Sequence, residues 1–264
     1  MLFDFQRFIP LGGFVRHYSW GSKASSGNTP YIADLLSMPA KKLPWAEYWL
    51  GAHNDLPSEI EALSGEKIPL NEAIKRYPTE ILGDICLNRI FTELPFLLKI
   101  LSCDSPLSIQ THPVKALAER LHSLMPESFP DANHKPEIVI ALSEFKALAG
   151  FRKLPEILAS LERRSFFKPW LQEFYQQSFT QSAIAVLCRE LFHLPKELKA
   201  SMLQEAQDYL SKDNDLTEQE KLFLYLLEKY PGDSGALFAF LLNYQQLKPG
   251  EALFLQPGIV HAYL

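Results

Sequence analysis

The sequence predicts a mixed, mainly β protein in which a β-rich domain is interrupted by an inserted all-α domain. Residues 1–150 contain short apolar runs bounded by proline, glycine and aspartate, as strands usually are. From Pro155 to about Tyr244, apolar residues recur with helical spacing. Strand-like sequence returns over residues 247–261, so we expect the chain to leave one β domain, build helices and come back.

These changes of pattern set the domain boundaries. We expect a discontinuous β domain of residues 1–151 and 245–264, with an inserted helical domain of residues 152–244. Strands are predicted over four runs of the first part: Glu47–Leu50, Phe96–Leu101, Leu107–His112 and Glu137–Leu142. Helices are expected over Leu70–Tyr77, where Asn71 resembles a capping residue, and over Val114–Leu124.

The helical spacing of apolar residues in the inserted block predicts six helices: Pro155–Arg163, Pro169–Gln177, Gln181–Phe192, Pro195–Leu210, Thr217–Lys229 and Ser234–Tyr244. Three of them begin at a proline, which the first turn of a helix tolerates. Thr217 and Glu220 form the sequence signature of a capping box, in which each side chain bonds the other residue's backbone N–H. We expect this block to be structural, because catalytic residue types do not gather in it.

Composition excludes several classes of protein. The 264 residues include 26 basic and 31 acidic side chains, a net charge of −5 that argues against nucleic-acid binding. Three widely spaced cysteines make neither a disulfide framework nor a paired metal motif, which suits a reducing compartment. Asp4 and Arg7 interrupt any signal-peptide core, and no apolar run reaches the roughly 20 residues of a membrane span. We therefore expect a soluble, cytoplasmic protein.

Four residues at the ends of strand-like runs are candidate metal ligands: Gln110, His112, Glu137 and His261. Gln110 and His112 are two residues apart, so in a strand their side chains point to the same face. Imidazole and carboxylate are standard zinc ligands, whereas a neutral amide oxygen is an uncommon one. Judged on spacing alone, two histidines and an acid in separate segments are more often a chance occurrence than a metal site.

The end of the chain makes the metal hypothesis stronger. Gly250 and Gly258, followed by His261, have the spacing of the second cupin motif, in which tight turns bring a strand histidine into the mouth of a jelly-roll barrel. The proline expected two residues before Gly258 is displaced by one, to Pro257.

Six ordered motifs carry a more specific resemblance. They are Tyr18-Ser-Trp-Gly-Ser22, Ala46-Glu-Tyr-Trp-Leu-Gly-Ala-His53, Leu94-Pro-Phe-Leu-Leu-Lys-Ile-Leu101, Leu107-Ser-Ile-Gln-Thr-His-Pro113, Asn133-His-Lys-Pro-Glu137, and Lys248-Pro-Gly-Glu251 with Val260-His-Ala-Tyr263. From about Gly12 onward the chain resembles the type I mannose-6-phosphate isomerases. The resemblance implies a cupin jelly-roll barrel and one Zn²⁺ per chain, bound by Gln110, His112, Glu137 and His261.

The resemblance also implies an activity, the interconversion of mannose 6-phosphate and fructose 6-phosphate through an enediol(ate), as a step of GDP-mannose biosynthesis. Lys135, His134 and Lys99 are the candidates for proton transfer or for contacts with the sugar phosphate, and Lys99 is alternatively a strand lysine that extends to solvent. Ser108, Trp20 and Glu47 are candidate substrate-binding residues. Ser108 is equally well read as structural, and Trp20 as part of the core.

The chain departs from the family at its C-terminal end. Family members continue beyond the His-Ala-Tyr-Leu motif with further strands and an arginine motif thought to be important in catalysis. We therefore expect a C-terminally truncated chain with an incomplete barrel and little activity alone. A complete chain is expected to be a monomer, and an open barrel edge would allow association. A non-catalytic metal-cupin module that binds sugar phosphates is the rival reading, and a purely structural remnant is the third.

Overall fold

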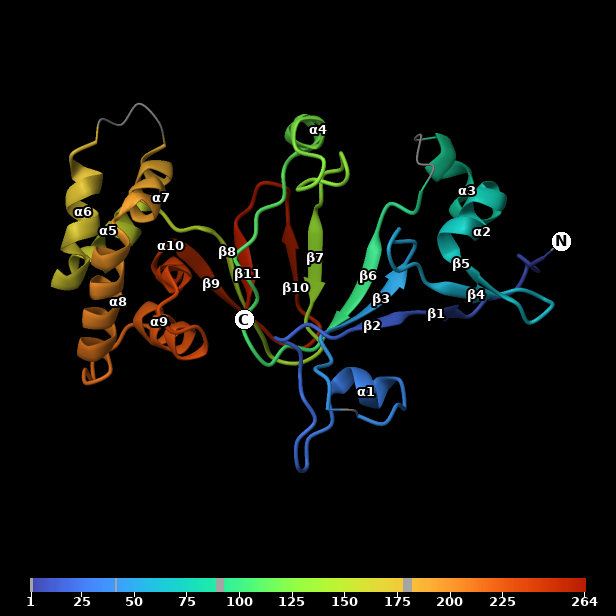
Figure 1. The fold of residues 1–264 in the computed structure, drawn as a ribbon, viewed down its shortest axis with the longest axis horizontal. Coiled ribbons are helices and arrows are strands. Elements are labelled where there is room, and N and C mark those ends of the chain that lie inside the picture. Colours follow the sequence, from blue (N-terminus) through green and yellow to red (C-terminus); the bar gives the residue numbers. More distant parts are fainter. Residues whose placement is uncertain (1, 41, 89–92, 178–181) are drawn as a thin grey trace. The chain divides into compact units, whose positions relative to one another are not determined.

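A computed structural model describes residues 2–40, 42–88, 93–177 and 182–264 of the chain, without the side chains of residues 85–88. The chain divides into two compact units, Met1–Ser105 and Pro106–Leu264. Both units combine strands with helices (Figure 1).

The first unit contains two three-stranded antiparallel sheets, ordered β1-β4-β5 and β2-β3-β6. Its elements are β1 Leu11–Gly12, β2 Phe14–Arg16, α1 Tyr31–Leu35, β3 Glu47–Gly51, β4 Glu59–Glu61, β5 Lys67–Pro69, α2 Leu70–Arg76, α3 Pro78–Asn88 and β6 Leu97–Leu101. The strands predicted around Glu47 and Leu101 are therefore present.

Strand β3 lies in the middle of its sheet and separates two environments. Tyr48 packs beside Val15 and Ile100 against a small core that includes Trp45. Glu47 and Trp49 point to the opposite face, because successive side chains of a strand alternate. Trp49 pairs in register with Lys99 of β6, so Lys99 lies on the same face as Glu47 and Trp49.

Helix α2 begins differently from the prediction. Its N-cap is Pro69, with no side-chain cap, and Asn71 lies inside the first turn, where its Oδ1 accepts a 2.9 Å hydrogen bond from the neighbouring backbone N of Glu72. The expectation that Asn71 caps this helix is wrong. The buried positions Leu70, Ala73 and Ile74 start the helix directly after β5, because they pack against the core of this unit.

The second unit contains a two-stranded sheet, β10-β7, and a three-stranded sheet, β11-β8-β9, all antiparallel. Its elements are α4 Lys115–Leu124, β7 Glu137–Ile140, β8 Phe145–Phe151, α5 Leu154–Glu162, η1 Ser165–Phe167, α6 Lys168–Tyr175, α7 Ala183–His193, α8 Lys196–Leu210, α9 Glu218–Lys229, η2 Ser234–Leu237, α10 Phe238–Leu241, β9 Leu242–Leu247, β10 Ala252–Leu255 and β11 His261–Tyr263.

One hydrophobic core joins the helices of this unit to its three-stranded sheet. Leu148 of β8, Leu242 of β9 and Ala262 of β11 are buried in the same cluster as the helical residues. Figure 1 shows α5 to α9 gathered on one side of that sheet. The core therefore holds β11, the strand that carries His261, against the helical layer.

Two predicted elements differ from the structure. The helix expected over Ser234–Tyr244 ends at Leu241, because Leu242 starts strand β9 and pairs with Phe151 of β8. The strand expected over Leu107–His112 is reduced to an isolated bridge between Gln110 and His261. The predicted start of another helix, Gln181, lies outside the described residues.

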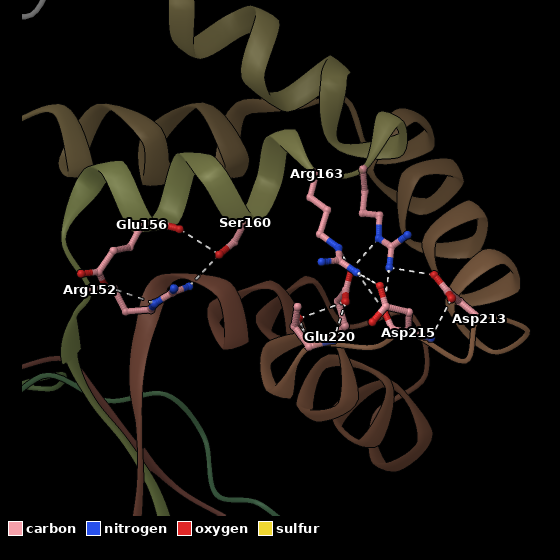
Figure 2. Close-up of polar contacts among 9 residues, drawn as sticks. Arg152, Glu156, Ser160, Arg163, Asp213, Asp215 and Glu220 are labelled. Atoms are coloured by element: carbon pink, nitrogen blue, oxygen red, sulfur yellow. Dashed lines mark hydrogen bonds and ion pairs between the residues drawn. The ribbon is translucent and has the colours of Figure 1, made fainter.

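The predicted capping box of α9 is confirmed. Glu220 N donates to Thr217 Oγ1 at 3.3 Å, and Thr217 N donates to Glu220 Oε2 at 2.8 Å. The other carboxylate oxygen of Glu220 accepts a 2.6 Å hydrogen bond from Arg164 Nε. Figure 2 shows Glu220 beside Arg163, Asp213 and Asp215, where Arg163 pairs with Asp215 at 2.7 Å. These charges join the end of α5 to the start of α9.

None of the described helices is long and apolar enough to cross a membrane. Of the cysteines whose side chains are described, Cys103 and Cys188 are free thiols.

Candidate metal centre

Three of the four residues proposed as ligands come together in the second unit. Each of His112, Glu137 and His261 offers one donor atom, and these three atoms lie within 4.8 Å of one another. They belong to segments far apart in the sequence, so only the folded chain forms this cluster.

One glycine turn and two strands position the cluster. The carbonyl of His112 accepts a 2.6 Å hydrogen bond from Gly258 N, and Gly258 has a φ of +89°, a conformation that favours glycine. Glu137 begins β7 and pairs with Leu255 of β10. His261 begins β11 and pairs with Ala149 of β8. The glycine of the cupin-like motif thus connects the loop of His112 to the segment that leads to His261.

The polar atoms of this cluster fit a cation. Nε2 of His112 and Nε2 of His261 are buried and have no hydrogen-bond partner among the described residues. Glu137 Oε1 lies 2.9 Å from the first, and Glu137 Oε2 lies 3.4 Å from the second, but neither contact is aligned as a hydrogen bond. Buried polar atoms without partners cost free energy, so a bound ion would relieve the cost at two atoms at once.

The imidazole of His261 is already oriented for metal binding. Its Nδ1 lies 2.9 Å from the carbonyl oxygen of Ile259, and this contact is a hydrogen bond when Nδ1 carries the proton. In that tautomer the lone pair is on Nε2, which faces Glu137. His261 is only 3% exposed, so water competes poorly for this atom.

Electrostatics favour an ionised carboxylate at the centre of the cluster. Burial raises the pKa of Glu137, but its contacts with His112 and His261 and a hydrogen bond from Tyr263 outweigh burial and hold this pKa well below its ordinary value. Burial lowers the pKa of His261, and Glu137 together with the Ile259 carbonyl raises it above its ordinary value. The anionic carboxylate therefore attracts positive charge to this point.

Gln110 lies beside the cluster, and its side chain is exposed. Its backbone forms an antiparallel bridge with His261, so the two side chains leave the backbone on the same face. Its amide Nε2 donates to Ser108 Oγ at 3.2 Å, which leaves the amide oxygen free of that bond. The geometry is compatible with a fourth ligand, and the role of Gln110 stays a prediction.

His134 and Lys135 precede Glu137 on an exposed segment. Lys135 Nζ pairs with Asp131 Oδ2 at 3.3 Å. Burial raises the pKa of Asp131, but a hydrogen bond from the Asn133 backbone and the charge of Lys135 lower it further than burial raises it. Proximity in sequence to Glu137 keeps both residues near the cluster, and their catalytic roles stay predictions.

The remaining candidates, Lys99, Glu47 and Trp20, belong to the first unit. Lys99 Nζ lies 3.4 Å from Glu47 Oε2 and 4.7 Å from the centre of the Trp49 ring. Glu47 is buried at 6% exposure, so the lysine supplies the positive charge that a buried carboxylate needs. The ring of Trp20 stacks on Tyr18, with 5.7 Å between centroids.

Tyr263 also contacts the cluster, although it was not among the site residues predicted from the sequence. Its hydroxyl donates a 2.8 Å hydrogen bond to Glu137 Oε2. Burial and the charge of Glu137 raise its pKa, so the hydroxyl keeps its proton and acts as a donor. The available signal was its position two residues after His261 in a strand, which places both side chains on one face.

Comparisons with known proteins identify the family of the chain. The family model of the phosphomannose isomerase type I catalytic domain matches residues 8–154, which include Gln110, His112 and Glu137. Mannose-6-phosphate isomerase of Mus musculus is 35% identical over 276 residues, and that of Homo sapiens is 34% identical; each match covers 98% of this chain. The chain spans 65% of the length of both relatives.

Solved structures give the same result. A zinc-bound mannose 6-phosphate isomerase matches with a TM-score of 0.81 at 33% identity. The Salmonella typhimurium enzyme bound to fructose 6-phosphate and zinc matches with the same TM-score and identity. Each match covers 97% of this chain and 65% of the solved chain, and they confirm the mixed fold of cupin type. Because the catalytic-domain model matches more than half of its residues, the chain belongs to the type I phosphomannose isomerase family.

Proposed function

We propose that this chain carries the zinc site of an aldose–ketose isomerase that interconverts mannose 6-phosphate and fructose 6-phosphate. The observation that carries the proposal is the cluster of His112, Glu137 and His261, in which two buried imidazole nitrogens have no hydrogen-bond partner among the described residues. Membership of the family and the zinc and fructose 6-phosphate named for its solved structures support the choice of metal and substrate.

His112, Glu137 and His261 would hold one zinc ion, with the amide oxygen of Gln110 as the fourth ligand. The chemistry that zinc supplies when bound is polarisation of the sugar oxygens and stabilisation of the negative charge that develops on them. Glu137 contributes an anionic oxygen, and the Ile259 carbonyl holds His261 in the tautomer that presents Nε2.

Proton transfer is the remaining task of the protein. The isomerisation needs a base that removes the proton on the carbon next to the carbonyl and returns it to the former carbonyl carbon, while the hydroxyl proton passes from one of the two oxygens to the other. We assign this task to His134 or Lys135, which are exposed and next to Glu137 in sequence.

Lys99 is proposed to contact the anionic sugar phosphate, with Glu47 orienting its ammonium group. Ser108 and Trp20 are proposed to contact the sugar.

The proposal is tested by measuring bound zinc, isomerase turnover and mannose 6-phosphate binding on the purified chain, with His261→Ala as the matched control. Zinc-dependent turnover that the control lacks supports the proposal, and the expectation of little turnover from this chain alone is tested in the same assay. Saturable binding of mannose 6-phosphate without turnover would instead favour the metal-cupin binding module. A folded chain that takes up neither zinc nor ligand contradicts both.

We also propose the domain division expected from the sequence, a discontinuous domain of residues 1–151 and 245–264 around an inserted domain of residues 152–244. The pairing of β8 and β9, whose residues flank the helical block, supports this division.

A cytoplasmic, monomeric protein without nucleic-acid partners is proposed as well. Ile138, Ile140 and Phe254 are exposed on the β10-β7 sheet, so sedimentation at increasing concentration tests the monomer directly.

A further inference from the structure

Tyr263 is held in place from both sides of β11. Its backbone pairs with Ala147 of β8, and its carbonyl accepts a 2.8 Å hydrogen bond from Leu107 N. The ring lies 5.6 Å from the ring of Phe145 and 5.7 Å from that of His261, measured between centroids. The backbone of Tyr263 is therefore fixed and its ring is packed, so its hydroxyl is held in one position.

That hydroxyl touches one oxygen of the central carboxylate. It donates to Glu137 Oε2 at 2.8 Å, while Glu137 Oε1 is the oxygen that lies 2.9 Å from His112 Nε2. The Glu137 side chain is about one third exposed (32%), so burial alone does not fix its rotation. A hydrogen bond to one oxygen sets the plane of the carboxylate and the direction in which the other oxygen points.

We infer that Tyr263 is a positioning residue for the metal centre: its hydroxyl holds Oε2 of Glu137 and so presents the carboxylate to a divalent transition-metal ion together with His112 and His261. Partners of this kind, which bond to a ligand rather than to the metal, typically change metal affinity 10- to 100-fold when removed (order of magnitude). The inference rests on the metal site of the proposed function, and it does not depend on the sugar or on turnover.

The chain offers a matched control. Tyr244 of β9 pairs with Leu148 in the same three-stranded sheet and packs against the same core. The described part of the structure shows no hydrogen bond from its hydroxyl, so Tyr244→Phe removes the same atom without touching Glu137. Both variants keep the aromatic ring and leave the packing of the sheet unchanged.

The test measures Zn²⁺ affinity of the full chain by competition with a chromogenic chelator, and the absorption spectrum of the Co²⁺-loaded protein. We expect Tyr263→Phe to bind Zn²⁺ about 10- to 100-fold more weakly and to alter the Co²⁺ spectrum, whereas Tyr244→Phe behaves like the wild type. Zn²⁺ affinity within twofold of the wild type together with an unchanged Co²⁺ spectrum would overturn the inference. The inference would also be overturned if circular dichroism showed that metal-free Tyr263→Phe is unfolded, because the hydroxyl would then stabilise the fold and not position the carboxylate.

A double-substitution cycle separates positioning from a general effect on the site. If Tyr263 acts through Glu137, Tyr263→Phe has no further effect on Zn²⁺ affinity in a Glu137→Ala background, where the weaker binding is measured by titration at high Zn²⁺ concentration rather than by retention after dialysis. Equal fold-changes in both backgrounds would contradict the inference. Every readout here is a property of the metal, so the inference is tested independently of the sugar isomerisation in the proposed function.

Discussion

The backbones of Gln110 and His261 exchange two hydrogen bonds, 2.8 Å from the nitrogen of Gln110 to the oxygen of His261 and 2.9 Å in the reverse direction. This bridge joins the loop that leads to His112 to the strand β11, which begins at His261. Since β11 is also bonded to β8, the position of His261 is set from both sides. Backbone pairing therefore sets the position of His261 in the site.

Removal of one imidazole should abolish metal binding. We expect His261→Ala to lower bound zinc from about one ion per chain to nearly none, because three ligands, one of them a neutral amide, bind zinc weakly. His193→Ala is the control, since His193 is exposed at the end of α7. Metal content after dialysis, measured by mass spectrometry, decides the matter, and retention of zinc by His261→Ala would refute the ligand assignment.

Substitution of Gln110 tests the neutral amide ligand. If its amide oxygen binds the metal, Gln110→Ala should weaken Zn²⁺ binding by roughly tenfold or more. Loss of even one supporting contact at a metal site typically changes metal affinity by about this much. Gln246→Ala, at an exposed position of β9, should leave affinity unchanged. Chelator competition gives both affinities, and identical values for the two variants would show that Gln110 only supplies the backbone bridge.

Lys99 should stabilise the first unit through Glu47. Lys99→Met leaves a buried carboxylate without its cation, and we expect a loss of about 1–3 kcal/mol in the free energy of unfolding. Lys67→Met breaks the exposed pair with Glu59 and should cost no more than about 1 kcal/mol. Urea unfolding measures both. A Glu47→Gln, Lys99→Met double variant should recover part of the loss, and additive losses would contradict the pairing.

The ion cluster at α9 should make stability depend on pH. Burial raises the pKa of Glu220, but hydrogen bonds from Arg164 and Thr217 lower it below the ordinary value of 4.5. A carboxyl group with a lowered pKa stabilises the fold above its unfolded-state pKa, and this stability is lost as the pH falls toward the folded-state value. Glu220→Gln should thus destabilise the chain by about 3 kcal/mol at pH 7 and by progressively less below pH 4.5.

The control for this experiment is Glu218→Gln, which removes an exposed carboxylate of the same helix turn that pairs with Lys221. It should change the free energy of unfolding by no more than about 1 kcal/mol. Urea unfolding at pH 7, 5 and 3 measures the difference from the wild type. A Glu220→Gln deficit that stays constant from pH 7 to pH 3 would show that the charge of Glu220 does not stabilise the fold.

Local sequence was enough to predict those elements whose structure is decided by neighbouring residues. Thr217 and Glu220 lie three residues apart, so their capping box could be recognised without knowledge of the rest of the chain. Helices α4 to α9 were predicted to within a few residues, because their apolar spacing and first-turn prolines act locally. Asn71 failed as a predicted cap because packing of Leu70 and Ile74 began the helix one residue before it.

Strands and the site depended on partners far along the chain. Leu242 continues a helical pattern in sequence, and it becomes a strand because β8 offers hydrogen bonds at that point. The segment Leu107–His112 has strand-like composition, but only Gln110 forms a bridge. Pattern alone does not show whether a partner strand is present, and for this reason strand boundaries were less predictable than helices.

By itself, the sequence determined which residue types stand in which order: the motifs that resemble the family, the histidine and glutamate ligands proposed, and the helical block between the two β segments. Only the tertiary structure decided that His112, Glu137 and His261 meet within 4.8 Å, and that Tyr263 bonds to the carboxylate between them. The physical reason is that the cluster joins segments separated by the whole helical block. Its geometry therefore follows from long-range backbone pairing and core packing, which no local pattern encodes.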